Sequence, residues 1–226
     1  MPLYVTPAGP MELAELYLGA KRVVVDSGYA GEMEWQRRVG ERLDPVTEKE
    51  FLSEAAWVVF NAGMRESVVR SKWAALSDAF LLWRSAREVT DHASECSAAA
   101  LSVFGHVRKV QAAVAIAGLV ADVGISQIRM SMDMDPEVFL TELPYVGAVT
   151  WRHLAKNLGL QMVKEDRHLV RLAGAWGRPS ADDMCREIAD WLGEPLSVVD
   201  LVLWRWCALG APASARQPAW QQPALF

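Results

Sequence analysis

The segment Leu143-Pro144-Tyr145-Val146-Gly147-Ala148-Val149-Thr150 decides the fold of this 226-residue chain. Asp135-Pro136 predicts the start of a helix that runs to residue 143, because aspartate is a good N-cap and proline fits the first helical position. Residues 144–147 predict a tight turn, and a second helix is expected over 148–158, ending at Gly159. The turn glycine lets the backbone approach a ligand, and the second helix begins with free amide groups. This corner is therefore a predicted anion site.

Helical patterns extend outward from this segment in both directions. Thr47 with Glu50 forms a capping box, and Asn61-Ala62-Gly63 ends the helix that it begins. Further helices are expected over residues 11–25, 65–80, 94–104, 106–122, 167–176, 180–192 and 197–209, the last three capped by Asp166, Ser180 and Ser197. Alternating apolar and polar runs are absent apart from a weak one at 23–25, so the predicted fold is all-α.

Composition indicates a chain with a well-formed core. Hydrophobic residues make up 52% and charged residues 23%, which excludes intrinsic disorder. The longest apolar run, residues 110–120, is shorter than the roughly 18 residues that a membrane-spanning helix needs. The N-terminus has no signal-peptide pattern, so we expect a cytoplasmic protein. Cys96, Cys185 and Cys207 are scattered, which argues against a disulfide framework, a zinc site or a four-cysteine iron–sulfur cluster.

Charge is unevenly distributed along the chain. The net charge is −5, which taken alone speaks against a nucleic-acid binder. Residues 145–178, however, carry six basic and two acidic side chains, a local charge of +4. A local basic face can follow a phosphate backbone, since affinity depends on the lysines and arginines that neutralise phosphates.

A second motif follows the first at a fixed distance. Asp166-Arg167-His168-Leu169-Val170-Arg171 begins nineteen residues after Gly147. The segments LPYVGAVTWRHLA and DRHLVRLA resemble the LPGxG hairpin and the D-x-H-x-x-R segment of the helix–hairpin–helix (HhH-GPD) DNA glycosylase superfamily. The close match covers residues 135–173. A looser likeness extends to residues 57–69, WVVFNAGMRESVV, which are similar to the family's wedge loop and part of its base pocket.

The resemblance implies a two-lobed helical bundle over residues 1–210, with a DNA cleft between the lobes. The hairpin and the catalytic aspartate would lie in one lobe, roughly residues 90–180, and the N- and C-terminal helices would form the other. Residues 211–226, rich in Ala, Pro and Gln, are predicted to form a flexible tail.

The resemblance assigns the catalytic carboxylate to Asp166. Cleavage of an N-glycosidic bond develops positive charge on the deoxyribose, and a fixed anion stabilises that charge and orients water. Asp166 is alternatively a helix N-cap, and one carboxylate can serve both roles. Val149 occupies the position where bifunctional members carry a Schiff-base lysine, so we expect a monofunctional enzyme without lyase activity. The isolated cysteines place the chain outside the iron–sulfur branch.

Further site residues follow from the same resemblance. The main-chain carbonyls of Thr141, Leu143 and Val146 are the expected ligands of a structural Na⁺ or K⁺ ion; no other cofactor is implied. His168 and Arg171 would support Asp166 or touch the DNA backbone, although His168 also fits an ordinary interior histidine. The expected DNA-binding hairpin residues are Pro144, Tyr145, Val146, Gly147, Ala148, Val149 and Thr150.

Base eversion requires a wedge and a stacking pocket. The loop from Asn61 supplies Met64 as the plug and Arg65 as a phosphate contact. Glu66 and Glu34 are candidates for base recognition, with solvated helix-end carboxylates as the alternative. Trp35 and Trp57 are the pocket candidates, whereas the tryptophans expected in the core are Trp73, Trp83, Trp191, Trp204 and Trp206.

The expected function is hydrolysis of the N-glycosidic bond of a damaged or modified base in double-stranded DNA by a monomeric enzyme. The alternatives are a non-catalytic DNA-binding module and a base-modifying enzyme that acts on hypermodified DNA. Gln222, Leu225 and Phe226 resemble the Q-x-x-L-F peptides that dock into bacterial sliding clamps, although a chance match in a low-complexity tail is the alternative.

Overall fold

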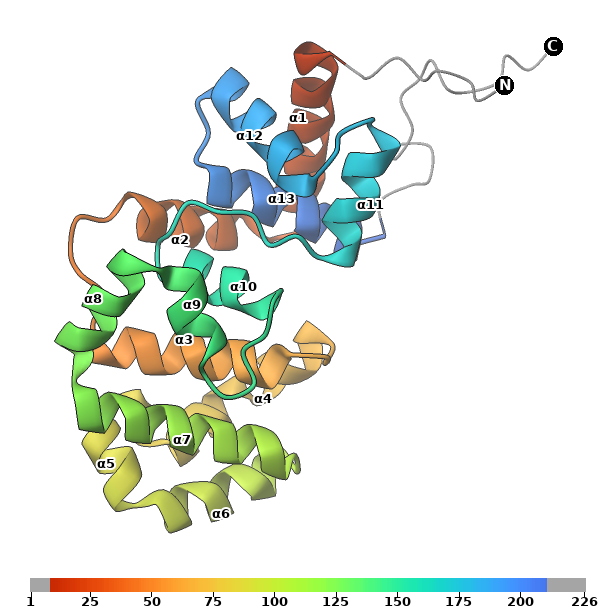
Figure 1. The fold of residues 1–226 in the computed structure, drawn as a ribbon. Coiled ribbons are helices and arrows are strands. Elements are labelled where there is room, and N and C mark those ends of the chain that lie inside the picture. The colour runs from red at the N-terminus through yellow and green to blue at the C-terminus, as the bar shows by residue number, and fades with distance from the viewer. Residues whose placement is uncertain (1–8, 211–226) are drawn as a thin grey trace, which may run out of the picture. The chain divides into compact units, whose positions relative to one another are not determined.

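The computed structural model describes residues 9–210 and confirms the all-α prediction (Figure 1). These residues form thirteen α-helices and one short 3₁₀ helix, with no strand among them. The weak alternating run at residues 23–25 lies inside the first helix. The described chain divides into two compact units, one built from residues 9–42 and 159–210 and the other from residues 43–158.

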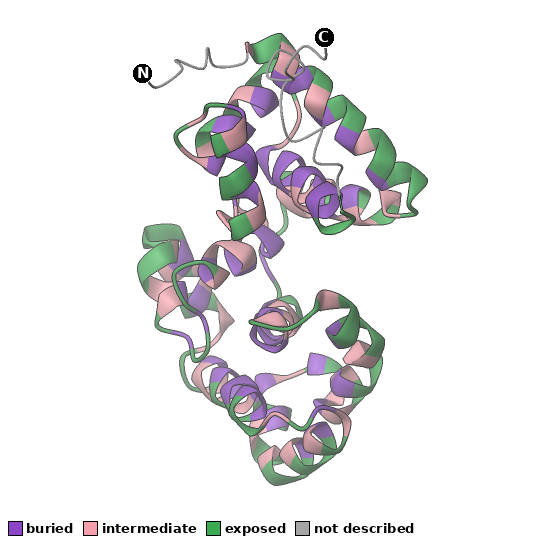
Figure 2. Ribbon diagram, turned by 90° about the vertical axis from the view of Figure 1, so that its right-hand side faces the viewer, coloured by how far each residue is buried: buried purple, intermediate pink, exposed green. Residues whose placement is uncertain are grey.

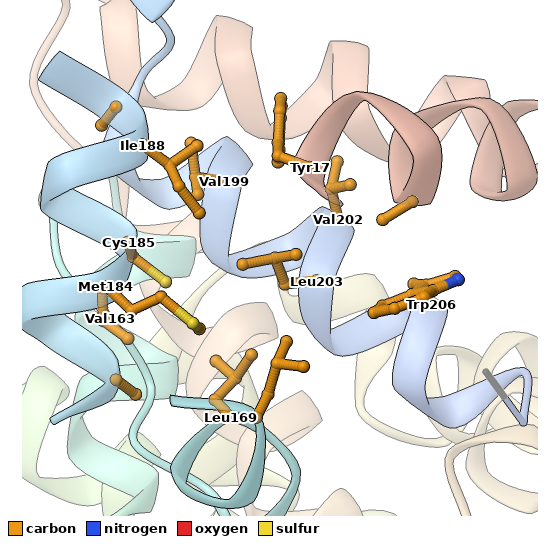
Figure 3. Packing of buried hydrophobic residues seen from close by; sticks show 14 of the residues in the cluster. Tyr17, Val163, Leu169, Met184, Cys185, Ile188, Val199, Val202, Leu203 and Trp206 are labelled. Atoms are coloured by element: carbon orange, nitrogen blue, oxygen red, sulfur yellow. The ribbon is translucent and has the colours of Figure 1, made fainter. Parts of the chain in front are cut away.

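The first unit joins both flanks of the chain around one hydrophobic core. Its described helices are α1 (Pro10–Asp26), α2 (Ala30–Glu41), α11 (Arg167–Ala175), α12 (Ala181–Leu192) and α13 (Leu196–Ala208). Helix α1 packs against α12 and α13, and Tyr17, Leu169, Ile188 and Leu203 meet in the core (Figure 3). Beside this core, the Glu194 carboxylate accepts hydrogen bonds from Lys21 of α1 and Arg37 of α2. These contacts tie residues distant in sequence into one body.

The second unit is continuous in sequence. Its helices are α3 (Glu48–Asn61), α4 (Glu66–Ala79), η1 (Leu81–Trp83), α5 (Ala86–Asp91), α6 (Ala93–Val103), α7 (Val107–Val123), α8 (Ile125–Met134), α9 (Pro136–Thr141) and α10 (Thr150–Asn157). Helix α7 packs against α3, α5, α6 and α8. Figure 2 shows buried residues along the inner faces of these helices and exposed residues outside. Phe60 contacts Phe80 and Phe104 in the aromatic part of this core.

Most of the predicted helix starts are confirmed by side-chain caps. Thr47 and Glu50 form the capping box of α3, and Asp135, Asp166 and Ser180 cap α9, α11 and α12. The cap predicted for the last helix is wrong, because α13 begins at Leu196 with Pro195 as its N-cap residue. The Ser197 amide instead donates to the side chain of Gln161 at 3.1 Å, a long-range contact that local pattern does not reveal.

Three α-helices, the 3₁₀ helix and one tryptophan depart from expectation. Helices α5 and η1 have six and three residues, too few for a helical stripe to predict them. Helix α2 buries only Met33 and Gln36, and α8 buries only Ile128 and Met132, so neither carries an apolar stripe strong enough to predict it. Trp191 is 58% exposed on α12, which makes its assignment to the core wrong. The other expected core tryptophans are buried, as at Trp83 and Trp206, or half-buried, as at Trp73 and Trp204.

The boundaries of the two units differ from the expected lobes. The hairpin belongs to the second unit, whereas Asp166 belongs to the unit formed by the two flanks of the chain. The physical reason is that Gln161 and Lys164, in the segment before Asp166, are hydrogen-bonded to α13 of the first unit.

The predicted flexible tail and the clamp-binding residues Gln222, Leu225 and Phe226 lie outside the described residues. In the described part of the chain, no single helix meets the length and hydropathy needed to cross a membrane. Helices α7 and α8 pass that test only as a pair, and they bend by 99°.

Candidate functional site

The hairpin between α9 and α10 is a tight turn held from inside. The Val146 amide donates to the Leu143 carbonyl at 3.0 Å, and both of these side chains are buried. Pro144, Tyr145 and residues 147–149 are exposed around this pair. The apolar side chains at the first and last positions of the turn therefore fix the backbone and present the rest of the hairpin outward.

The amide groups of the hairpin divide into two sets. The Gly147 amide donates to the Thr150 hydroxyl at 2.7 Å, so this predicted phosphate contact is already engaged within the turn. Among residues 9–210, no acceptor meets the amides of Ala148, Val149 and Thr150, which are the last two residues before α10 and its first residue. These three groups sit at the positive end of the helix dipole, and they are the amides that suit an anion.

Tyr145 occupies a backbone conformation that favours glycine. Its φ is +68°, in the left-handed region, which costs a non-glycine residue roughly 1–2 kcal/mol. Its ring centroid lies 5.5 Å from the Nζ of Lys109 and 6.0 Å from the ring of His106, which it meets edge-on. The side chain thus has partners that offset the backbone strain.

Lys109 is a site residue that sequence reasoning missed. Its side chain is 1% exposed at the start of α7, and its ammonium donates to the carbonyls of Val59, Phe60 and Ala62 at 2.8, 2.7 and 2.6 Å. Burial lowers the pKa of Lys109 to about 8. The signal was present in the sequence, because Lys109 lies on the apolar stripe that continues through Ala113 and Ile116.

The predicted wedge loop follows α3 and contains a sharp turn. The Met64 amide donates to the Asn61 carbonyl at 2.9 Å, and Gly63 has a φ of +70°. Met64 is 40% exposed and Arg65 is exposed, as a plug and a phosphate contact require. Glu66 pairs with Arg70 one turn later on α4, so the structure favours the helix-end interpretation for this carboxylate.

The two predicted pocket tryptophans are both half-buried. Trp57 packs edge-on against Trp73 with ring centroids 5.0 Å apart, and Arg70 lies 5.5 Å from its ring. These contacts occupy part of its surface, which makes it a packing residue of the second unit. Trp35 lies on α2 of the first unit, beside the exposed Glu34.

Asp166 caps α11 through a single oxygen. Its Oδ1 accepts the amides of His168 at 2.8 Å and Leu169 at 3.2 Å. Within the described part of the chain no group donates to Oδ2. The side chain is partly exposed, as is His168, and Arg171 is exposed. The cap therefore orients the carboxylate and leaves one of its oxygens for a ligand.

The segment before Asp166 is tied to α13 by two side chains. The buried Asp200 accepts the Lys164 amide on Oδ1 at 2.8 Å, and the Lys164 carbonyl accepts the Asp166 amide at 2.6 Å. Gln161 accepts the Ser197 amide. Asp200 is the second residue of the candidate site that the sequence analysis did not single out, and its signal was an acidic residue inside the apolar stripe of α13.

The structure thus assembles the predicted residues in two groups. Lys109 brings the wedge loop and the hairpin together in the second unit, since it contacts Ala62 and Tyr145. Asp166, His168, Arg171 and Trp35 belong to the first unit.

Comparison with known proteins gives one informative likeness. No protein-family model matches the sequence, and no curated protein matches it. The crystal structure of the 8-oxoguanine DNA glycosylase of Thermotoga maritima superposes with a TM-score of 0.56, over 85% of this chain and 95% of that chain, at 18% sequence identity. A likeness at this identity concerns the fold. The chain therefore shares the all-helical fold of that DNA glycosylase.

Proposed function

We propose that the protein is a monofunctional DNA glycosylase, which hydrolyses the N-glycosidic bond of an everted base in double-stranded DNA. The observation that carries the proposal is the state of Asp166, whose carboxylate is fixed through Oδ1 by two amides while Oδ2 accepts nothing from residues 9–210. The fold shared with a DNA glycosylase supports it, as does the group of unengaged amides at the start of α10.

The chemistry follows from the charge that develops during bond cleavage. As the bond from C1′ to the base breaks, the base takes the bonding electron pair and the sugar gains oxocarbenium character. The negative Asp166 stabilises this charge, and Oδ2 orients a water molecule that adds to C1′. The water loses a proton as it adds, and a proton neutralises the departing base. The products are a free base and an abasic site.

Strand cleavage is not part of the proposal. A Schiff base needs an amine at the reacting carbon, and the hairpin carries Val149 where the resembling family places its lysine. Lys109 contacts the hairpin through the ring of Tyr145, and its ammonium donates to three backbone carbonyls. We accordingly expect the reaction to end with hydrolysis.

An alkali-metal ion at the hairpin fits the available donors. Neutral carbonyl oxygens from Thr141, Leu143 and Val146 suit a hard monovalent cation. The Leu143 carbonyl already lies on the inside of the turn, where it accepts the Val146 amide. Such an ion would supply positive charge for a backbone phosphate. The three cysteines are too few for a four-cysteine cluster, so we propose an enzyme without one.

The substrate class is tested with a panel of duplex oligonucleotides. The panel contains alkylated bases, 8-oxoguanine and hypermodified bases, and alkali then cleaves any abasic site. We expect release of at least one base by the wild-type protein and loss of release in Asp166→Asn, with DNA affinity retained. Release that survives in Asp166→Asn would contradict the role of Asp166. Binding without release from any substrate would favour a non-catalytic DNA-binding module.

A further inference from the structure

Three segments of the second unit converge on one buried ammonium group. The end of α3 contributes the carbonyls of Val59 and Phe60, the following loop contributes that of Ala62, and the hairpin contributes the ring of Tyr145. Lys109 thus contacts the root of the predicted wedge and the tip of the predicted phosphate grip. The wedge loop contacts this ammonium through the Ala62 carbonyl, and the hairpin contacts it through the Tyr145 ring.

We propose that Lys109 is a positioning residue that holds the wedge loop and the hairpin in one mutual arrangement, so that base eversion and phosphate binding occur in register on duplex DNA. The proposal rests on the proposed glycosylase function. It concerns the step that precedes chemistry, because the residue assigned to bond cleavage, Asp166, belongs to the other unit.

The hydrogen-bond count supports a specific role for a lysine at this position. An ammonium has three N–H groups, and each of the three carbonyls lies within 2.8 Å of Nζ. Carbonyls at a helix C-terminus lack amide partners and carry the negative end of the helix dipole. Lys109 donates to two such carbonyls of α3, those of Val59 and Phe60, and also to the carbonyl of Ala62, which follows the helix. An apolar side chain in its place would leave these acceptors without a donor.

The ring of Tyr145 connects the Lys109 ammonium and its three carbonyl partners to the hairpin. Tyr145 makes this contact with Lys109 from a backbone φ of +68°, a conformation that favours glycine. His106, which precedes α7, borders the same ring at 6.0 Å. The hairpin tip therefore depends on the position of the ammonium, which in turn depends on the loop at Ala62.

The matched control is Lys72 of α4. Its ammonium also donates to a helix-end carbonyl, that of Val103 at 2.7 Å, and lies 5.6 Å from the ring of Phe104. Lys72 belongs to the same unit, and its contacts are with neither the wedge loop nor the hairpin. Lys72→Met thus removes one hydrogen bond to a helix-end carbonyl and one ring contact, the same kinds of interaction, without affecting the proposed coupling.

The experiment compares duplex and single-stranded substrates that carry the same releasable base. Lys109→Met is expected to lower kcat/KM on the duplex at least 10-fold and on the single strand less than 3-fold, because a single-stranded base needs no eversion. Lys72→Met is expected to change neither substrate by more than 3-fold. Lys109→Gln, which keeps two donors on a side chain one bond shorter, should give an intermediate loss and replaces Lys109→Met if that variant does not fold. Equal losses on both substrates, or no loss, would refute the proposal.

A double-mutant cycle tests the link to the hairpin directly. If Lys109 acts through Tyr145, the combined Lys109→Met and Tyr145→Gly variant should lose little more duplex activity than the more affected single variant. Fully multiplicative losses would show that the two residues act independently. The fluorescence of 2-aminopurine in bound duplex reports eversion without base release. This fluorescence therefore tests the role of Lys109 even if the wild-type protein releases no base. The absence of base release would contradict the proposed function but not the proposed role of Lys109.

Discussion

Replacing Asp200 should impair the reaction through its effect on the position of Asp166. Asp200 is fully buried, and its Oδ1 accepts the Lys164 amide at 2.8 Å. Loss of a hydrogen bond to a charged acceptor costs about 1.5–3 kcal/mol. For a chain of this size, each kcal/mol lowers Tm by roughly 2–4 °C, so a cost of about 2 kcal/mol predicts a fall of about 4–8 °C for Asp200→Ala.

The effect on the reaction should exceed what lost stability explains. The Lys164 carbonyl also accepts the Asp166 amide, so release of the Lys164 amide frees the backbone that carries the proposed catalytic carboxylate. Because a displacement of about 1 Å can lower a rate 100-fold, we expect kcat for base release to fall about 10- to 100-fold well below Tm, with DNA affinity unchanged. Single-turnover release at 20 °C, with the folded fraction measured by circular dichroism, separates the two effects.

Asp200→Asn is the matched control, since its amide oxygen accepts the same hydrogen bond. It should recover most of the rate lost in Asp200→Ala. An Asp200→Ala variant with a lower Tm but a normal single-turnover rate would show that the tether serves stability alone, and the link to Asp166 would have to be abandoned.

Three further predictions concern other residues. Asp166→Ala should lower the free energy of unfolding by ~1 kcal/mol through loss of the cap, whereas Asp166→Asn should lower it by only a few tenths, and chemical denaturation measures the difference. Burial alone would raise the pKa of Glu194, but hydrogen bonds from Lys21 and Arg37 outweigh it and lower that pKa. Its stabilisation is thus present above the ordinary value of 4.5 and lost as pH falls through the lower folded pKa, so denaturation from pH 6 to 3 should be less pH-dependent in Glu194→Gln. Borohydride should trap no covalent adduct of the wild-type protein with DNA, given Val149 in the hairpin; a stable adduct would disprove the hydrolytic mechanism.

Local signals account for the parts of the fold that the sequence predicted. A cap residue and the helix that it begins are neighbours in the chain, which is why Thr47, Asp135 and Asp166 could be identified from pattern alone. The turn at Leu143 and Val146 is local in the same sense. The position of the hairpin turn could therefore be predicted from the sequence, whereas the left-handed backbone of Tyr145 could not.

The unpredicted parts depend on contacts between distant residues. The carbonyls that surround Lys109 lie 47 to 50 residues earlier in the chain, and Asp200 meets an amide 36 residues away. Helix α2 forms although it buries few residues of its own, and Arg205 of α13 pairs with Glu32 in its first turn. The apolar stripes of α7 and α13 single out Lys109 and Asp200 as unusual, but a one-dimensional pattern carries no information on the partners that these two residues contact.

The discontinuity of the first unit has a consequence for synthesis on the ribosome. The second unit is complete once residue 158 has emerged, whereas α1 and α2 must wait for α13, which is made last among the described helices. A nascent chain can thus form the hairpin early, while the backbone that bears Asp166 acquires its tether only when Asp200 arrives. A polypeptide released before α13 would keep the hairpin, the proposed phosphate grip, and would lack the tether at Lys164, so premature termination would separate the proposed DNA-binding turn from the support of the proposed catalytic segment.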